Sequence, residues 1–154
     1  MNQALWGIDL GGTKIEGIIL PSLNEPAPVT RTRIDTEAHK GYPHILSQIA
    51  AMVAKLQSQS GFTAPAIGIA TPGTLDPGTQ TMKNCNTTSL IGKPLKKDLE
   101  ELLKIPVVLA NDANCFALAE THWGVVKDKY PFAQVVFGII MGTGVGGGIV
   151  VNGK

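Results

Sequence analysis

The chain is short of charge, of aromatic side chains and of long apolar runs. Charged residues make up 16% of its 154 residues and aromatic residues 5%, and the formal net charge is +1. Such a balance gives no electrostatic reason to expect nucleic acid or a membrane surface as a partner. No stretch approaches the ~20 apolar residues of a membrane span, and Trp6 and Asp9 interrupt any signal-peptide-like run. We therefore expect a cytoplasmic protein.

Cysteine and histidine are also scarce. The two cysteines, Cys85 and Cys115, lack C-x-x-C spacing, and the three histidines form no ligand pair with them. We expect both thiols to be reduced and structural.

Glycine and apolar residues are plentiful by contrast, with 18 glycines, 10 prolines and 44% hydrophobic residues. This composition is typical of a globular chain rich in turns. The spacing of apolar residues predicts strands over 4–9, 14–20, 29–34, 66–70, 107–110 and 132–141. It predicts helices that begin near Pro43, at Pro94 and within the capping segment 111–114, together with a small hairpin over 74–86. The order of these elements favours a mixed sheet covered by helices on both faces.

The last predicted element is an unfinished hairpin. A return strand runs through Asn152, and Asn152-Gly153 is a strong turn signal that only Lys154 follows. We expect the sequence to be a truncated part of a longer protein. Residues 134–152 should then lack partners or find them in another copy of the chain, so we expect a homo-oligomer.

Two glycine-rich turns, Gly11 to Lys14 and Gly142 to Gly148, each follow an apolar strand. Both can present backbone N–H groups to an anion, and Thr13, Lys14 and Thr143 add side-chain donors. They resemble a P-loop and a dinucleotide loop, but each precedes a strand instead of a helix. They therefore predict phosphate held by hairpins. Tight turns that need positive φ remain the alternative for either one alone.

Polar residues at strand ends are the other candidates. Asp9 could hold Mg²⁺ through water, with an Asx-turn as the alternative. Asp112 could meet a substrate hydroxyl during phosphoryl transfer, with helix capping as the alternative that position alone favours. Asn84 and Asn86 would share one face of a strand and bracket adjacent hydroxyls, unless they only form a turn.

Together these segments resemble the ROK family (repressors, open reading frames and sugar kinases). The resemblance rests on residues 7–14, 111–115 and 142–148, and it extends from end to end of the chain. Pro72-Gly73 and residues 84–90 resemble the sugar-side segment of bacterial fructokinases and of N-acetylglucosamine or N-acetylmannosamine kinases. The resemblance implies an α/β, actin-like ATPase (ribonuclease H-like) fold. Residues 1–125 would form a lobe with a mixed five-stranded sheet flanked by helices, and residues 126–154 would open a second lobe.

The resemblance also implies an activity, the ATP-dependent phosphorylation of a hexose or N-acetylhexosamine hydroxyl, as in fructokinase or glucokinase. Asp112 would be the general base, and Asp9 would support Mg²⁺ through water. Sugar would be bound by Gly73, Asn84, Asn86, Asn111 and Asp112. ATP would be bound by Gly7, Asp9, Gly11, Gly12, Thr13, Lys14, Gly142, Thr143, Gly144 and Gly146.

The family's E-x-G-H segment, its zinc site and most of its second lobe would lie beyond Lys154. Zinc could therefore bind only through a segment absent from this chain, and we expect the chain alone to be an inactive kinase. Two alternatives stay open. A sugar-responsive ROK repressor would need a helix-turn-helix, for which the few residues before the first strand leave no room. A non-catalytic sugar or nucleotide sensor would not depend on Asp112.

Overall fold

The computed structural model describes residues 4–142 and 144–154. The chain divides into two compact units, Met1–Leu109 and Ala110–Lys154. The expected lobes, 1–125 and 126–154, stay a prediction about the complete protein.

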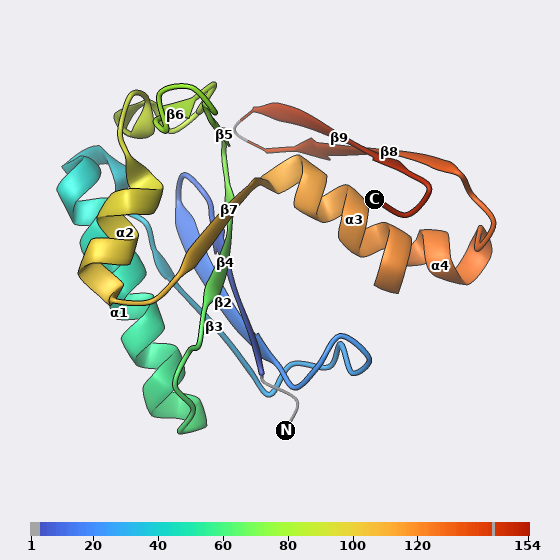
Figure 1. Cartoon of the computed structure of the whole chain (residues 1–154), viewed down its shortest axis with the longest axis horizontal. Coiled ribbons are helices and arrows are strands. Elements are labelled where there is room, and N and C mark those ends of the chain that lie inside the picture. The colour runs from blue at the N-terminus through green and yellow to red at the C-terminus, as the bar shows by residue number, and fades with distance from the viewer. Residues whose placement is uncertain (1–3, 143) are drawn as a thin grey trace. The chain divides into compact units, whose positions relative to one another are not determined.

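The first unit is built on the predicted mixed five-stranded sheet, whose strand order is β3-β2-β1-β4-β7 (Figure 1). The strands are β1 (Leu5–Leu10), β2 (Lys14–Leu20), β3 (Thr30–Asp35), β4 (Ile67–Thr71) and β7 (Val107–Asn111). β2 pairs antiparallel with both β1 and β3, whereas β1 and β4 run parallel. The carboxyl ends of β1 and β4 therefore lie at the same end of the sheet, which is where ligands bind in many α/β folds.

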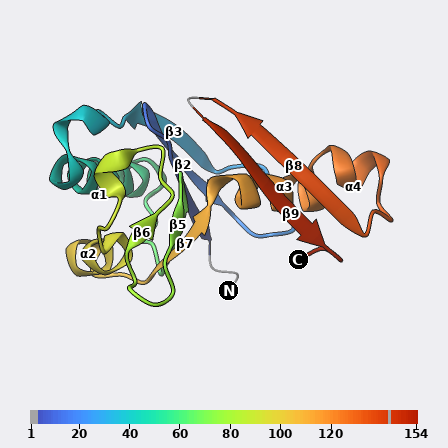
Figure 2. The ribbon, with the colours of Figure 1, turned by 90° about the horizontal axis from the view of Figure 1, so that it is seen from above.

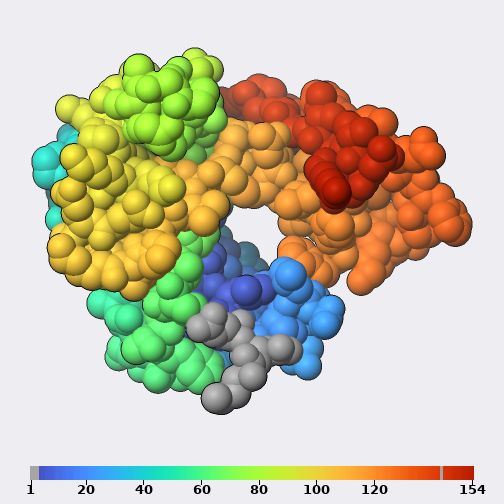
Figure 3. All heavy atoms as spheres, viewed as in Figure 1, coloured from blue at the N-terminus to red at the C-terminus, as the bar shows by residue number. Residues whose placement is uncertain are grey.

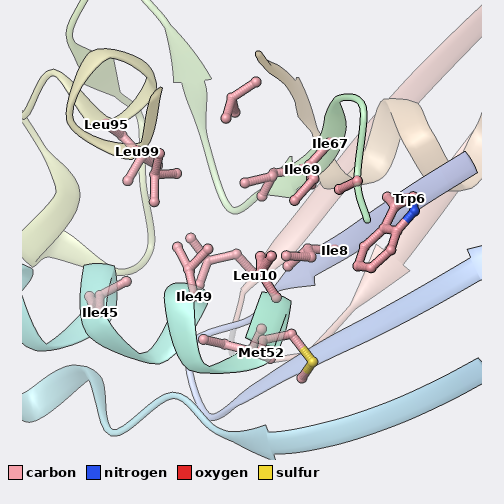
Figure 4. Packing of buried hydrophobic residues seen from close by; sticks show 14 of the residues in the cluster. Trp6, Ile8, Leu10, Ile45, Ile49, Met52, Ile67, Ile69, Leu95 and Leu99 are labelled. Atoms are coloured by element: carbon pink, nitrogen blue, oxygen red, sulfur yellow. The ribbon is translucent and has the colours of Figure 1, made fainter. Parts of the chain in front are cut away.

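Helices α1 (Tyr42–Ser60) and α2 (Leu95–Leu103) pack on one face of this sheet. A Cβ on Gly17 would lie 2.6 Å from Met52 Sδ, which shows how closely α1 approaches β2. Ile8 of β1 and Ile69 of β4 point toward Ile49 and Met52 of α1 (Figure 4). The alternation of apolar residues in the strands is what supplies this buried face.

Between β4 and α2 the chain forms the predicted small hairpin, β5 (Thr74–Leu75) and β6 (Met82–Lys83), followed by a 3₁₀ turn at Thr88–Leu90. The hairpin lies beside the segment that leads into α2 (Figure 3), because the Met82 amide donates to the Lys93 carbonyl at 2.9 Å and the Gly92 amide donates to the Met82 carbonyl at 2.8 Å. Asp76 fixes its turn, because Oδ1 accepts the amides of Gly78 and Thr79 at 2.9 and 3.0 Å and Oδ2 pairs with Lys83 Nζ at 2.8 Å. A further 3₁₀ turn, Ala38–Lys40, precedes α1.

The second unit contains α3 (Asp112–Trp123), α4 (Val125–Lys129) and an antiparallel hairpin of β8 (Val135–Met141) and β9 (Val145–Val151) (Figure 2). The inner face of the hairpin packs on α3. A Cβ on Gly138 would lie 2.9 Å from Ala117 Cβ, and a Cβ on Gly148 would collide with the Ala113 carbonyl. The expectation that this hairpin lacks partners within the chain is therefore wrong, because small residues let it lie close against the helix.

The opposite face of the hairpin, called the outer face below, is apolar and exposed. Its side chains are between 48% and 82% exposed. They are Val135, Phe137, Ile139, Met141, Val145, Ile149 and Val151.

Candidate functional site

The first glycine turn joins β1 to β2 and presents an exposed backbone. Gly12, Thr13 and Lys14 are exposed, and the Gly11 amide donates to the Lys14 carbonyl at 3.0 Å. Lys14 Nζ forms an ion pair with Asp35 of β3. The turn therefore combines accessible backbone with an ammonium group at the carboxyl end of β1, which is a suitable arrangement for an anion.

Asp9 lies on β1 just before this turn, on the sheet face that points away from α1 and α2. Its partner in the register of β2 is Glu16, which accepts hydrogen bonds from Arg31 and Arg33 at 2.6 and 2.8 Å. Burial alone would raise the pKa of Glu16, but the hydrogen bonds and charges of the two guanidinium groups outweigh it and lower that pKa.

Gly7, also predicted to bind the nucleotide, lies in the middle of β1 and not in the turn. It pairs with Ile18 and with Gly68, and a Cβ there would be 3.1 Å from Ile18 Cγ2. The close approach of Ile18 already accounts for a glycine at this position.

Gly73, Asn84 and Asn86 come together beyond the end of β4. A Cβ on Gly73 would collide with Cys85 Sγ and with the Lys83 carbonyl, and the Asn86 amide donates to the Pro72 carbonyl at 3.4 Å. The lack of a side chain at Gly73 thus allows the Asn84 to Asn86 segment to pack beside it. Both asparagines are exposed.

The strand geometry predicted for Asn84 and Asn86 is wrong. β6 ends at Lys83, and Asn84 has a φ of 56°, in the left-handed region that asparagine tolerates better than most residues. The two amides therefore follow a turn and do not share one face of a strand. Cys85 between them is buried, and burial raises the pKa of its thiol. This agrees with a structural role.

Thr87 brings the asparagine segment (Asn84 to Asn86) next to the first glycine turn. Its Oγ1 lies 3.4 Å from the position that a Cβ on Gly12 would occupy. The glycine turn and the asparagine segment are therefore neighbours. The sequence included Thr87 in a motif but gave no signal that singled it out.

In the second unit, Asn111 and not Asp112 caps α3. The Asn111 Oδ1 accepts the amides of Ala113 and Asn114 at 3.1 and 3.2 Å, so the capping interpretation of Asp112 is wrong. Asn111 Nδ2 also donates to Asp112 Oδ1 at 3.0 Å, and the Ala113 amide donates to the same oxygen at 2.8 Å. These contacts hold one oxygen of a half-buried carboxylate at a helix N-terminus, where negative charge is favourable.

The second glycine turn is shorter than predicted. The Gly142 amide donates to the Gly144 carbonyl at 2.8 Å, and β9 begins at Val145. Thr143 lies outside the described residues. Gly146 is already in β9, where a Cβ would lie 3.2 Å from Ala113 Cβ. This contact places the turn at the same end of the second unit as Asp112.

Other features of the described chain add no chemistry. Within residues 4–142 and 144–154, no three or more His, Cys, Asp or Glu residues gather as metal ligands. No helix in these residues has the length and apolar character needed to cross a membrane. A pocket of about 560 Å³ lies at the opposite end of the sheet from the first glycine turn, and no titratable side chain lines it.

Comparison with known proteins places the chain in a family. The sequence model of the ROK family matches residues 5–154, and the chain belongs to this family. It is 37% identical over 150 residues to the N-acetyl-D-glucosamine kinase of Pectobacterium atrosepticum, covering 97% of this chain and 46% of the relative. The chain thus spans about half the length of the curated relatives it matches, which fits the expectation of an N-terminal portion.

Solved structures agree with this assignment. A ROK family glucokinase from Streptomyces griseus, in complex with glucose and AMPPNP, superposes with a TM-score of 0.84 at 29% identity, covering 99% of this chain and 46% of that one. A ROK family transcriptional regulator, homologue of the E. coli MLC protein, gives a TM-score of 0.76 at 19% identity over 100% of this chain and 38% of its own. The second likeness shows the fold alone. The predicted actin-like ATPase fold of ROK sugar kinases is confirmed.

Proposed function

We propose that the complete protein is an ATP-dependent kinase that phosphorylates a hydroxyl group of a hexose or N-acetylhexosamine in the cytoplasm, where ATP is available. The observation that carries the proposal is the adjacency of the Gly11 to Lys14 turn and the Asn84 to Thr87 segment within one unit. The Gly11 to Lys14 turn can bind phosphate, and the Asn84 to Thr87 segment can bind sugar hydroxyls. Relatives named as an N-acetyl-D-glucosamine kinase and a glucokinase support the same class of reaction.

In this proposal, the turn from Gly11 through Gly12 and Thr13 to Lys14 binds the phosphates of ATP. The Lys14 ammonium group then leaves its ion pair with Asp35 and pairs with a phosphate of the nucleotide. Exposed amides and an ammonium group fit polyphosphate. Asp9, which is exposed and adjacent, would hold Mg²⁺ through water, and the metal would neutralise phosphate charge when bound. Gly142, Thr143, Gly144 and Gly146 of the second glycine turn are also proposed to bind ATP.

Asp112 is proposed as the general base that accepts the proton of the attacking sugar hydroxyl. Its Oδ1 is held by Asn111 and by the Ala113 amide, which would orient the carboxylate. Phosphoryl transfer depends mainly on positioning and charge neutralisation, so an oriented carboxylate suits the reaction. Gly73, Asn84, Asn86 and Asn111 would contact the sugar, since amide groups both donate to and accept from hydroxyls.

The 154-residue chain by itself is proposed to be inactive. It spans about half the length of its relatives, and zinc, if the complete protein binds it, would need ligands from outside this chain. A formal net charge of +1 gives no support for nucleic acid as a partner.

The test compares Asp112→Asn with Asp128→Asn in the complete protein, using coupled ADP release over a panel of hexoses and N-acetylhexosamines. Asp128 is an exposed residue of α4 in the same unit and serves as the matched control. We expect Asp112→Asn to lower kcat by about 10²- to 10⁴-fold with a smaller effect on sugar affinity. Turnover unchanged in Asp112→Asn would exclude this carboxylate as the base and favour a non-catalytic sensor.

We also propose that this chain self-associates through the outer face of its hairpin, with a second copy as the occupant. Seven exposed apolar side chains could bury roughly 600 Å² per copy. That is somewhat below the ~800 Å² per partner of a standard interface, so a weak, concentration-dependent dimer is expected. A face of this size without a charged side chain is unusual for a monomer.

Sedimentation of the 154-residue chain tests the interface. Phe137→Ser should abolish dimer formation, because Phe137 lies on the outer face. Phe132→Ser should leave it intact, because Phe132 is 93% exposed but precedes β8. A wild-type chain that stays monomeric at every concentration would contradict the proposal.

A further inference from the structure

A buried threonine just after β3 donates hydrogen bonds to two carbonyl groups of the first glycine turn. Thr36 is fully buried, and its Oγ1 donates to the Gly11 carbonyl at 2.7 Å. Its backbone amide donates to the Thr13 carbonyl at 2.9 Å. One residue therefore contacts both sides of the turn, although nothing in the sequence pattern drew attention to it.

These contacts determine which way the turn's amides point. In a trans peptide, the carbonyl of one residue and the N–H of the next point in opposite directions, and the described residues contain no cis peptide bond. Because the Gly11 carbonyl is directed at the Thr36 hydroxyl, the Gly12 N–H is directed away from Thr36. Because the Thr13 carbonyl is directed at the Thr36 amide, the Lys14 N–H is directed away as well.

We propose that Thr36 is a positioning residue that holds the Gly11 to Lys14 turn in its anion-binding conformation before any ligand arrives. The inference rests on the proposed function, because the anion it prepares for is the polyphosphate of ATP. A preset turn avoids the entropic cost of ordering a glycine-rich backbone on binding, and glycine loses more conformational freedom than any other residue when it is fixed. Thr36 acts through the turn and does not itself reach the ligand, since its side chain is fully buried.

The chain offers a matched control for a purely structural role. Thr71, at the end of β4, is 1% exposed, and its Oγ1 donates to the Gly73 carbonyl at 3.1 Å. Thr36→Val and Thr71→Val thus remove the same hydroxyl from a comparably buried site, and each takes a donor from a glycine carbonyl. Only Thr36→Val removes a hydrogen bond to the Gly11 to Lys14 turn.

The test titrates the ¹⁵N-labelled 154-residue chain with inorganic tripolyphosphate and follows the Gly12 and Lys14 amide signals by NMR. Wild type, Thr36→Ser, Thr36→Val and Thr71→Val are compared. We expect Thr36→Val to weaken tripolyphosphate binding about five- to tenfold, as expected for the loss of one hydrogen bond to a buried carbonyl. Thr36→Ser, which keeps the hydroxyl, should stay within about twofold of wild type, and so should Thr71→Val.

A second readout needs no ligand. The Gly11 amide, which donates to the Lys14 carbonyl across the turn, should exchange its hydrogen faster in Thr36→Val than in Thr71→Val. Wild-type affinity or unchanged Gly11 exchange in Thr36→Val would overturn the positioning role and leave the proposed function standing. Failure of the wild-type chain to bind tripolyphosphate would count against the proposed function itself and would overturn both.

Discussion

Replacing Gly148 with alanine should separate β9 from the first turn of α3. The new Cβ would collide with the Ala113 carbonyl and would lie 2.8 Å from Asn114 Cα. These are backbone atoms that cannot rotate away, so the cost should reach the upper part of the ~1–3 kcal/mol typical of overpacking. Alanine also lowers the conformational entropy of the unfolded chain, which stabilises the folded state by about 0.4–1 kcal/mol and offsets part of this cost. We expect a net loss of about 2 kcal/mol, or about 30-fold in the ratio of folded to unfolded second unit.

Hydrogen exchange of residues 135–151 measures this loss separately from the stability of the first unit. Gly147→Ala is the matched control, because its Cβ would face the exposed ring of Phe137 at 3.0 Å and that ring can turn aside. Protection of the β9 amides should fall about 30-fold in Gly148→Ala and change little in Gly147→Ala. Equal protection in the two variants would refute the idea that close backbone packing on α3 requires the glycine.

Three further predictions concern the first unit. Asn84→Gly should keep the stability of the chain, whereas Asn84→Ala should lose about 1 kcal/mol in denaturant unfolding. A φ of 56° is unfavourable for alanine because of its Cβ, and glycine has none. The Lys83 hydrogen bond, aided by the Thr79 and Gly78 amides, lowers the pKa of Asp76 to about 2. The stability it contributes is therefore present above the ordinary pKa of 3.8 and is lost as the pH falls from there toward 2, so urea midpoints of wild type and Asp76→Asn should converge over that window. Lys104→Gly should raise the melting temperature, since Lys104 ends α2 with a φ of 58°.

The sequence predicted those parts of the fold whose signals are local. Ile45, Ile49, Met52 and Leu56 recur at helical spacing and are all fully buried on α1. Asp76-Pro77-Gly78 predicted a turn, and the Asp76 carboxylate stabilises that turn by accepting two backbone amides. The five strands of the first sheet were also predicted, because each is a short apolar segment next to a glycine, proline or asparagine that marks a turn.

The errors arose where tertiary contacts override local preference. Asn111 and Asp112 are both good helix caps, so the sequence could not tell which of the two would cap α3. Asn84 continues a strand by spacing, yet the packing of Cys85 against Gly73 turns the chain at that point. Thr36 carried no signal at all, because its role depends on carbonyls 23 and 25 residues earlier in the chain.

The second glycine run shows why a glycine motif cannot be given a single function. Gly142 and Gly144 form the turn, whereas Gly146 and Gly148 face Ala113 across the inner surface of the hairpin. Glycine in the turn leaves the backbone open to a ligand, but glycine in β9 lets a strand approach a helix. Loss of kinase activity on substituting Gly148 would therefore not identify a phosphate contact. Only a variant of Gly142 or Gly144 that leaves β9 protected from exchange, yet weakens nucleotide binding, would assign this turn to the phosphates.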